Sequence, residues 1–110
     1  MIEKIVLNYL IDKGFMAYME MPEDRPEKFI IVEKTSSQRD DLLFSSTFAI
    51  QSYAPTLLEC AELNDLVVLA MFEMTDCEDV TRSKLNTSNN YTDTATKDYR
   101  YQAVFDVTHY

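Results

Sequence analysis

Few residues in this sequence are of the types that perform catalysis. His109 is the only histidine and lies at the end of a predicted strand, so a Ser-His-Asp or Cys-His relay would have to be built around a strand-end residue. Gly14 is the only glycine, which rules out the glycine-rich phosphate loops of nucleotide-binding enzymes. We therefore interpret His109 as a structural residue and predict that the chain is not an enzyme.

The two cysteines do not supply enough ligands for a structural metal site. Cys60 falls in a predicted helix and Cys77 in the turn after it, whereas a zinc cage takes four ligands. We predict reduced and mostly buried thiols, with a disulfide or a reactive thiol as the alternative.

The chain is strongly acidic, with 19 acidic and 10 basic residues and a net charge of −9. Binding to phosphate backbones depends on clustered Lys and Arg, so this balance disfavours direct recognition of nucleic acid. The acids gather in predicted loops, where solvated surface is their expected role. Asp76, Glu78 and Asp79 are the candidate for a weak cation site, but they lack the spacing and the glycine of an EF-hand loop. We predict neither a metal nor a cofactor.

Length and composition indicate one folded domain over residues 1–110. Apolar residues make up 46% of the chain and charged residues 26%, as in ordinary globular proteins. No basic leader with an apolar core opens the sequence, and no run approaches the roughly 18 apolar residues of a membrane span. We expect synthesis in the cytosol and no contact with a membrane.

Hydrophobic periodicity predicts a helix and two strands in the first third of the chain. Ile2–Lys13 has apolar residues at helical spacing, and Gly14 follows where a left-handed cap is needed. A short strand is predicted over 15–20. The charged segment between Pro22 and Pro26 is a connector, because each proline removes a ladder donor. Lys28–Lys34 is apolar at consecutive positions, which predicts a strand that is covered on both faces or paired at an interface.

The remaining two thirds of the sequence predict three further strands and a long helix. Alternation predicts strands over Leu43–Tyr53 and Tyr99–Tyr110, the latter with Phe105 on its core face and Gln102 on its wet face. Val80–Asn86 is a third strand. A helix from Pro55, placed in its first turn, runs to about Met74. Together these elements predict an α+β fold with a mixed, mainly antiparallel sheet of about five strands and two helices packed on one face.

Two polar segments are predicted as long loops, Thr35–Leu42 and Thr87–Asp98. The second has almost no apolar anchor and is longer than a compact domain usually needs, so we expect it to be functional or mobile. Both are candidates for segments that become ordered when a partner binds.

Both predicted helices carry more apolar surface than one sheet can cover. Leu7 and Ile11 lie off the main face of the first helix, while Leu58, Leu66 and Leu69 lie on the side of the second that carries its acids. These residues predict oligomerisation, unless the two helices cover each other inside one subunit. The residues predicted to contact another copy or a partner are Leu7, Ile11, Leu66, Leu69, Asn89 and Tyr91.

Three stretches resemble a known family. They are "YMEMPEDRPEKFIIVEKT" (18–35), "FAIQSYAPTLLECAELNDLVVLAM" (48–71), and "KLNTSNNYTDT" (84–94) together with the closing "YRYQAVFDVTHY" (99–110). This strand-and-helix sequence resembles the small tail terminator, or tail completion, proteins of long-tailed bacteriophages and of prophages in Gram-positive bacteria. The resemblance extends over most of the chain and contains no chemical motif.

The resemblance implies a structural virion protein made in the cytoplasm of a host bacterium. Such a subunit assembles into a ring, typically a hexamer, at the head-proximal end of the tail. Its partners would be further copies of itself, the tail tube protein and a head-connector or neck protein, and the family has no catalytic residues to transfer. Six copies at −9 each would carry −54, and an acidic channel would let DNA pass without binding it.

Two other interpretations remain open at this stage. The first alternative is another neck or head-completion protein of a phage, which would have a size and charge similar to those of a tail terminator protein. The second alternative belongs to a different functional class: a small ligand-binding or enzymatic α+β domain that acts as a monomer or dimer.

Overall fold

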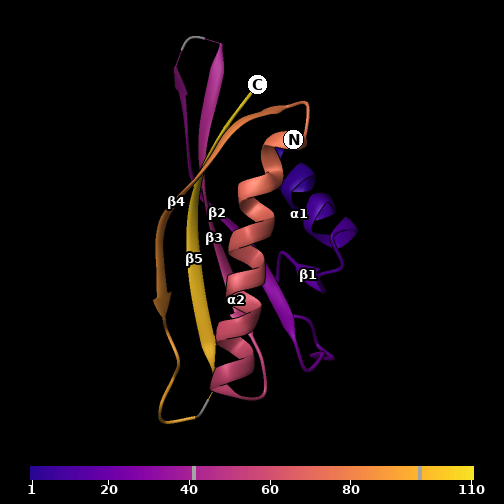
Figure 1. The fold of residues 1–110 in the computed structure, drawn as a ribbon, viewed down its shortest axis with the longest axis vertical. Helices are drawn as coiled ribbons and strands as arrows, with labels where there is room; N and C mark the ends of the chain where they lie inside the picture. Colours follow the sequence, from indigo (N-terminus) through magenta and orange to yellow (C-terminus); the bar gives the residue numbers. More distant parts are fainter. Residues whose placement is uncertain (41, 97) are drawn as a thin grey trace.

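The chain forms an α+β fold of two helices and a five-stranded sheet (Figure 1). This computed structural model describes residues 1–40, 42–96 and 98–110. The elements in chain order are α1 (Ile2–Asp12), β1 (Ala17–Tyr18), β2 (Phe29–Asp40), β3 (Leu43–Tyr53), α2 (Leu57–Phe72), a 3-10 turn η1 (Glu73–Asp76), β4 (Val80–Asn90) and β5 (Arg100–His109). The fold class predicted from the sequence is confirmed.

The strands lie in the order β1-β2-β3-β5-β4. Only β1 and β2 run parallel, and all other neighbouring strands are antiparallel. The sheet is therefore mixed but mainly antiparallel, as predicted. The β2–β3 hairpin projects beyond the end of α2 and gives the molecule a length of 45 Å against a width of 24 Å (Figure 1).

Helix α1 ends where its glycine allows the chain to reverse. Gly14 has a φ of 101°, its N–H donates to the Ile11 carbonyl at 3.0 Å, and the Phe15 N–H donates to the Leu10 carbonyl at 3.1 Å. This pair of bonds is the Schellman arrangement, which satisfies carbonyls that the helix leaves open. The predicted cap is confirmed.

Helix α2 begins two residues later than predicted. Thr56 is the N-cap, and its hydroxyl accepts a hydrogen bond from the Glu59 N–H at 3.2 Å. Pro55 therefore precedes the helix and does not occupy its first turn. Thr56 is the N-cap because its hydroxyl accepts a hydrogen bond from an amide of the first turn, and a proline side chain has no atom that could accept this bond. The apolar residues at the two ends of α2 are not buried, since Leu57 and Phe72 are 42% and 47% exposed.

Both helices pack on the same face of the sheet. Val6 and Leu10 of α1 join Val67 and Met71 of α2 over Phe105, and all five are fully buried. Tyr9 links the helices, because its hydroxyl donates to the Ala70 carbonyl at 2.6 Å. One face of each helix is thus used to form a single core.

The opposite face of the sheet is apolar at one end and polar elsewhere. Phe29 stacks on Tyr53 with ring centroids 4.8 Å apart, and Tyr18 packs beside them. Further along, Gln51 donates to Glu33 at 3.4 Å and to the Gln102 side chain at 3.2 Å. The prediction of a strand covered on both faces is confirmed for Phe29–Val32, whereas Lys28 and Glu33 are exposed.

The two segments predicted as long loops are largely strands. β2 continues to Asp40 and β4 to Asn90, so the loop predictions are wrong for residues 35–40 and 87–90, while residue 41 lies outside the described residues. Each polar segment continues an apolar strand whose register with β3 or β5 is already fixed. These residues are already ordered in a single copy, so the hypothesis that a partner orders them no longer applies to them.

Candidate functional site

A partly buried hydrogen-bond chain of Ser37, Ser46 and His109 comes closest to a catalytic arrangement. Ser46 Oγ lies 2.8 Å from His109 Nε2 and 3.0 Å from Ser37 Oγ, while His109 Nδ1 lies 3.2 Å from the Tyr110 carbonyl. Strands β2, β3 and β5 bring these residues together because 37, 46 and 109 all point toward the helices. Ser46 has no exposed surface and His109 is 6% exposed, whereas Ser37 is exposed, and Ser37 and His109 both line an open concavity of about 450 Å³. His109 ends β5, as expected from the sequence, and its ring is held between Ser46 and the Tyr110 carbonyl.

Both cysteines are free thiols held in their protonated form. Cys60 is fully buried and donates to the Ser52 carbonyl at 3.0 Å. Burial raises the pKa of Cys60 and of Cys77 above the usual value, and for Cys77 the neighbouring Asp76 raises it further. Both thiols are therefore weak nucleophiles at neutral pH.

Within the described residues, no group of three or more His, Cys, Asp or Glu side chains is placed to hold a metal ion. Asp76 lies in η1 and Glu78 and Asp79 follow in the turn before β4, so the candidate cation site spans two different local structures.

An open groove lies between α2 and the turn that joins α1 to β1. Its volume is about 470 Å³, and its apolar lining includes Phe15, Met16, Leu63, Leu66 and Leu69. An ion pair stands at each end, Lys13–Glu73 at 3.5 Å and Lys28–Glu59 at 3.6 Å. The lining of the groove is mainly apolar.

The exposed side of α2 combines leucines with acids. Leu58, Leu66 and Leu69 are 69%, 57% and 61% exposed, and Glu62 and Asp65 are exposed between them. We call these five residues the leucine–acid face. Two of its leucines also line the groove, so the face and the groove form one continuous surface.

The six residues predicted to form an interface do not form one surface. Leu66 and Leu69 lie together at the groove, while Ile11 is 46% exposed on α1. Leu7 is half-buried and packs against the core, so most of its side chain is covered within the subunit. Asn89 and Tyr91 lie at the end of β4, on the outer edge of the sheet. The predicted contacts thus fall on α1, on α2 and on the edge strand.

The sheet has a long strand near each edge. β4 is the outermost strand on one side and has 11 residues. On the other side β1 pairs with only Ile30 and Ile31, so no strand among the described residues pairs with the outer edge of β2 from Val32 to Gln38. Unpaired edges offer a row of N–H and C=O groups to another strand.

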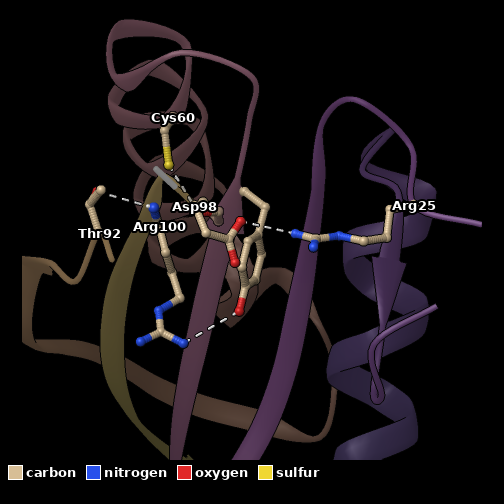
Figure 2. A network of polar contacts seen from close by, with 7 residues as sticks. Arg25, Cys60, Thr92, Asp98 and Arg100 are labelled. Carbon is tan, nitrogen blue, oxygen red and sulfur yellow. Dashed lines mark hydrogen bonds and ion pairs between the residues drawn. The ribbon is translucent and has the colours of Figure 1, made fainter. Parts of the chain in front are cut away.

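Arg25 lies in the connector between Pro22 and Pro26 and contacts residues at the end of the sheet where β3 ends and β5 begins (Figure 2). Its guanidinium lies 5.2 Å from the Phe29 ring and 5.4 Å from the Tyr53 ring, and it forms an ion pair with Asp98 at 3.1 Å. Nearby, the Arg100 backbone N–H donates to the Thr92 hydroxyl at 3.2 Å. Sequence reasoning missed this contact, because no local pattern relates Arg25 to a residue 73 positions away.

Neither protein-family models nor curated proteins give a match to this chain. No helix in the described ranges is long and apolar enough to cross a membrane.

Proposed function

We propose that this chain is a structural virion protein that caps the completed tail tube of a long-tailed phage as a ring, and that the ring takes part in joining head to tail. The observation that carries the proposal is the pair of free sheet edges, because a subunit with two different open edges can join its neighbours head to tail. The resemblance of the sequence to tail terminator proteins supports the same role.

The topology favours pairing between β4 of one copy and β2 of the next. Within a copy, β5 runs antiparallel to both β3 and β4, and β2 runs antiparallel to β3. It follows that β4 and β2 point in opposite directions, so a neighbour in the same orientation would add an antiparallel pair. Two different edges form a heterologous interface, which closes into a ring when the rotation between copies allows it.

The registers identify which residues would meet. Arg82 pairs with Thr108, which pairs with Ser45, which in turn pairs with Gln38. Arg82 on one edge and Gln38 on the other are therefore level across the sheet. Two copies that join without a shift along the strands would bring these two positions together.

The charge of the ring would suit a channel for DNA. β4 carries Arg82 and Lys84 and has no acidic residue, although the chain as a whole carries −9. Pairing would use the basic residues of β4 at the interface and leave acids for the exposed surfaces. We propose that the acids line the bore, where they would repel DNA. A ring structure with the acids on its outer rim and a neutral or basic bore would refute this arrangement.

The test is assembly of the purified protein, alone and with preassembled tail tubes. Electron microscopy and sedimentation velocity should detect rings, either free or at the tube ends. Subunits that stay monomeric under both conditions contradict the proposal, and so does a dimer that holds a metabolite.

Cysteine pairs test the edge contact separately. The variant Arg82→Cys with Gln38→Cys should form a ladder of covalent oligomers on mild oxidation. The matched control Arg82→Cys with Ser45→Cys places its second thiol on an inner strand, where a neighbouring copy cannot reach, and should give no ladder. Rings that form without a ladder would retain the capping role and refute the β4–β2 contact.

A further inference from the structure

We infer that the leucine–acid face of α2 and the adjoining groove bind a cationic amphipathic helix of a second protein. This inference goes beyond ring formation and does not depend on it. The surface is lined by α2, by the turn at residues 13–16 and by Lys28, Phe29 and Ile30, whereas the proposed ring contact uses β4 and the outer edge of β2 beyond Ile31. It assigns the face to a partner of different charge and not to another copy of this chain.

The apolar part of the surface has the layout that an amphipathic helix recognises. Leu58 and Leu69 are separated by eleven residues, or about 16 Å along the helix, and Leu66 lies between them. Beside the last two leucines, the groove of about 470 Å³ can take a large apolar side chain from the partner. Helices that bind such grooves place apolar anchors at i, i+3 or i+4, and i+7.

Met16 makes the far wall of the groove adaptable. It is 53% exposed, and its unbranched thioether side chain can adjust to an incoming group. Across the groove, Leu63 and Ala70 are packed into the subunit and form a fixed floor. A packed floor with an exposed, unbranched methionine opposite it suits apolar anchors of different shapes.

The charges on α2 identify the partner as basic. Leu57–Phe72 contains no Lys or Arg. Glu59 and Glu73 at the ends of the groove are already paired with lysines, whereas Glu62 and Asp65 have no ion pair among the described residues. These two carboxylates lie one turn from the exposed leucines, so lysines or arginines flanking the partner's apolar stripe would meet them.

The same charges argue against a second copy as the occupant. Two copies of the leucine–acid face brought together would place carboxylates against carboxylates with no cation on either helix. Such like-charge contacts oppose association and favour a partner of opposite charge.

The first experiment uses two synthetic helical peptides of 16 residues with the same leucine spacing. One has lysine at the flanking positions and the other has glutamate. Fluorescence anisotropy should show binding of the lysine peptide only, and binding should weaken as salt is added. Amide NMR shifts on binding should be confined to α2 and the turn at residues 13–16. Equal binding of both peptides, or shifts spread over the acidic surface, would overturn the inference.

Variants locate the apolar contact. The double variant Leu66→Ser, Leu69→Ser should weaken binding of the lysine peptide at least tenfold, because both anchors are lost. It should fold normally, as checked by circular dichroism, because both side chains are more than half exposed. Leu42→Ser is the matched control, since Leu42 is 80% exposed at the β2–β3 hairpin and should leave binding unchanged. Equal effects of the double variant and the control would refute the site.

Charge reversals test the acidic part of the face. Glu62→Lys with Asp65→Lys should weaken binding at least tenfold. Glu78→Lys with Asp79→Lys changes the net charge by the same amount in the turn before β4 and should have a much smaller effect. Equal losses would mean that only overall charge matters. Self-association that disappears in Leu66→Ser would show that the occupant is another copy, and would also overturn the inference.

Discussion

Replacing Ser46 with alanine tests how much the buried hydrogen-bond chain stabilises the fold. Ser46 Oγ contacts two partners, Ser37 Oγ at 3.0 Å and His109 Nε2 at 2.8 Å, and it has no exposed surface. The variant loses a hydrogen bond of about 1 kcal/mol and leaves a buried ring nitrogen without a partner, which costs about 1–2 kcal/mol more. We expect the free energy of unfolding to fall by about 2–3 kcal/mol.

For a chain of this length, that loss corresponds to a melting temperature lower by about 10 °C. Thermal and urea unfolding followed by circular dichroism measure both quantities. Ser45→Ala is the matched control, because it is the same substitution on the neighbouring, exposed side of β3 and should change stability by less than about 0.5 kcal/mol. If Ser46→Ala were no more destabilising than Ser45→Ala, the hydrogen bonds between Ser37, Ser46 and His109 would not contribute to stability.

Three further predictions concern the first helix. Gly14→Ala should cost about 1 kcal/mol, since the new Cβ meets nothing within 4 Å and the loss comes from the φ of 101° alone; an unchanged urea midpoint would contradict this. Tyr9→Phe removes the 2.6 Å hydrogen bond to the Ala70 carbonyl and should also cost about 1 kcal/mol, measured by the same unfolding assay. A backbone hydrogen bond and the Lys34 ammonium at 3.1 Å hold the pKa of the Glu3 carboxyl below its usual 4.5. Its contribution to stability is therefore present above about pH 4.5 and is lost as the pH falls through the lowered pKa, so Glu3→Gln should be less stable than the parent at pH 7 and should lose less on acidification.

The sequence was sufficient for elements whose apolar pattern is strong. Leu43–Tyr53 was predicted with the bounds that the structure gives, and the single glycine marked the end of α1. The polar halves of β2 and β4 were missed because both of their faces are wet, so no alternation of apolar residues marks them. They are strands because their partners β3 and β5 are fixed, which is information from elsewhere in the chain.

The candidate surfaces were predicted only in part. Leu66 and Leu69 were expected to be exposed and are, whereas the burial of Leu7 depends on how α1 sits on the sheet. Asn64 was missed although it occupies the buried stripe of α2, four residues after Cys60 and three before Val67. Its side chain donates to Ser88 at 2.9 Å, which joins α2 to the edge strand. The spacing of Asn64 from Cys60 and Val67 places it in the buried stripe, but a search for apolar residues at helical spacing passes over a polar residue.

Strand β5 follows every other element in the chain, yet it lies between β3 and β4. During synthesis, β4 therefore emerges from the ribosome before the strand that attaches it to the sheet. Contacts between β3 and β5 join residues about fifty or more positions apart, and such long-range pairing is a slow step in folding. Until that step is complete, β4 has no rigid support. In the proposed ring, a half-made subunit would therefore present no ordered β4 edge, and the order of the strands would delay assembly until each copy has finished folding.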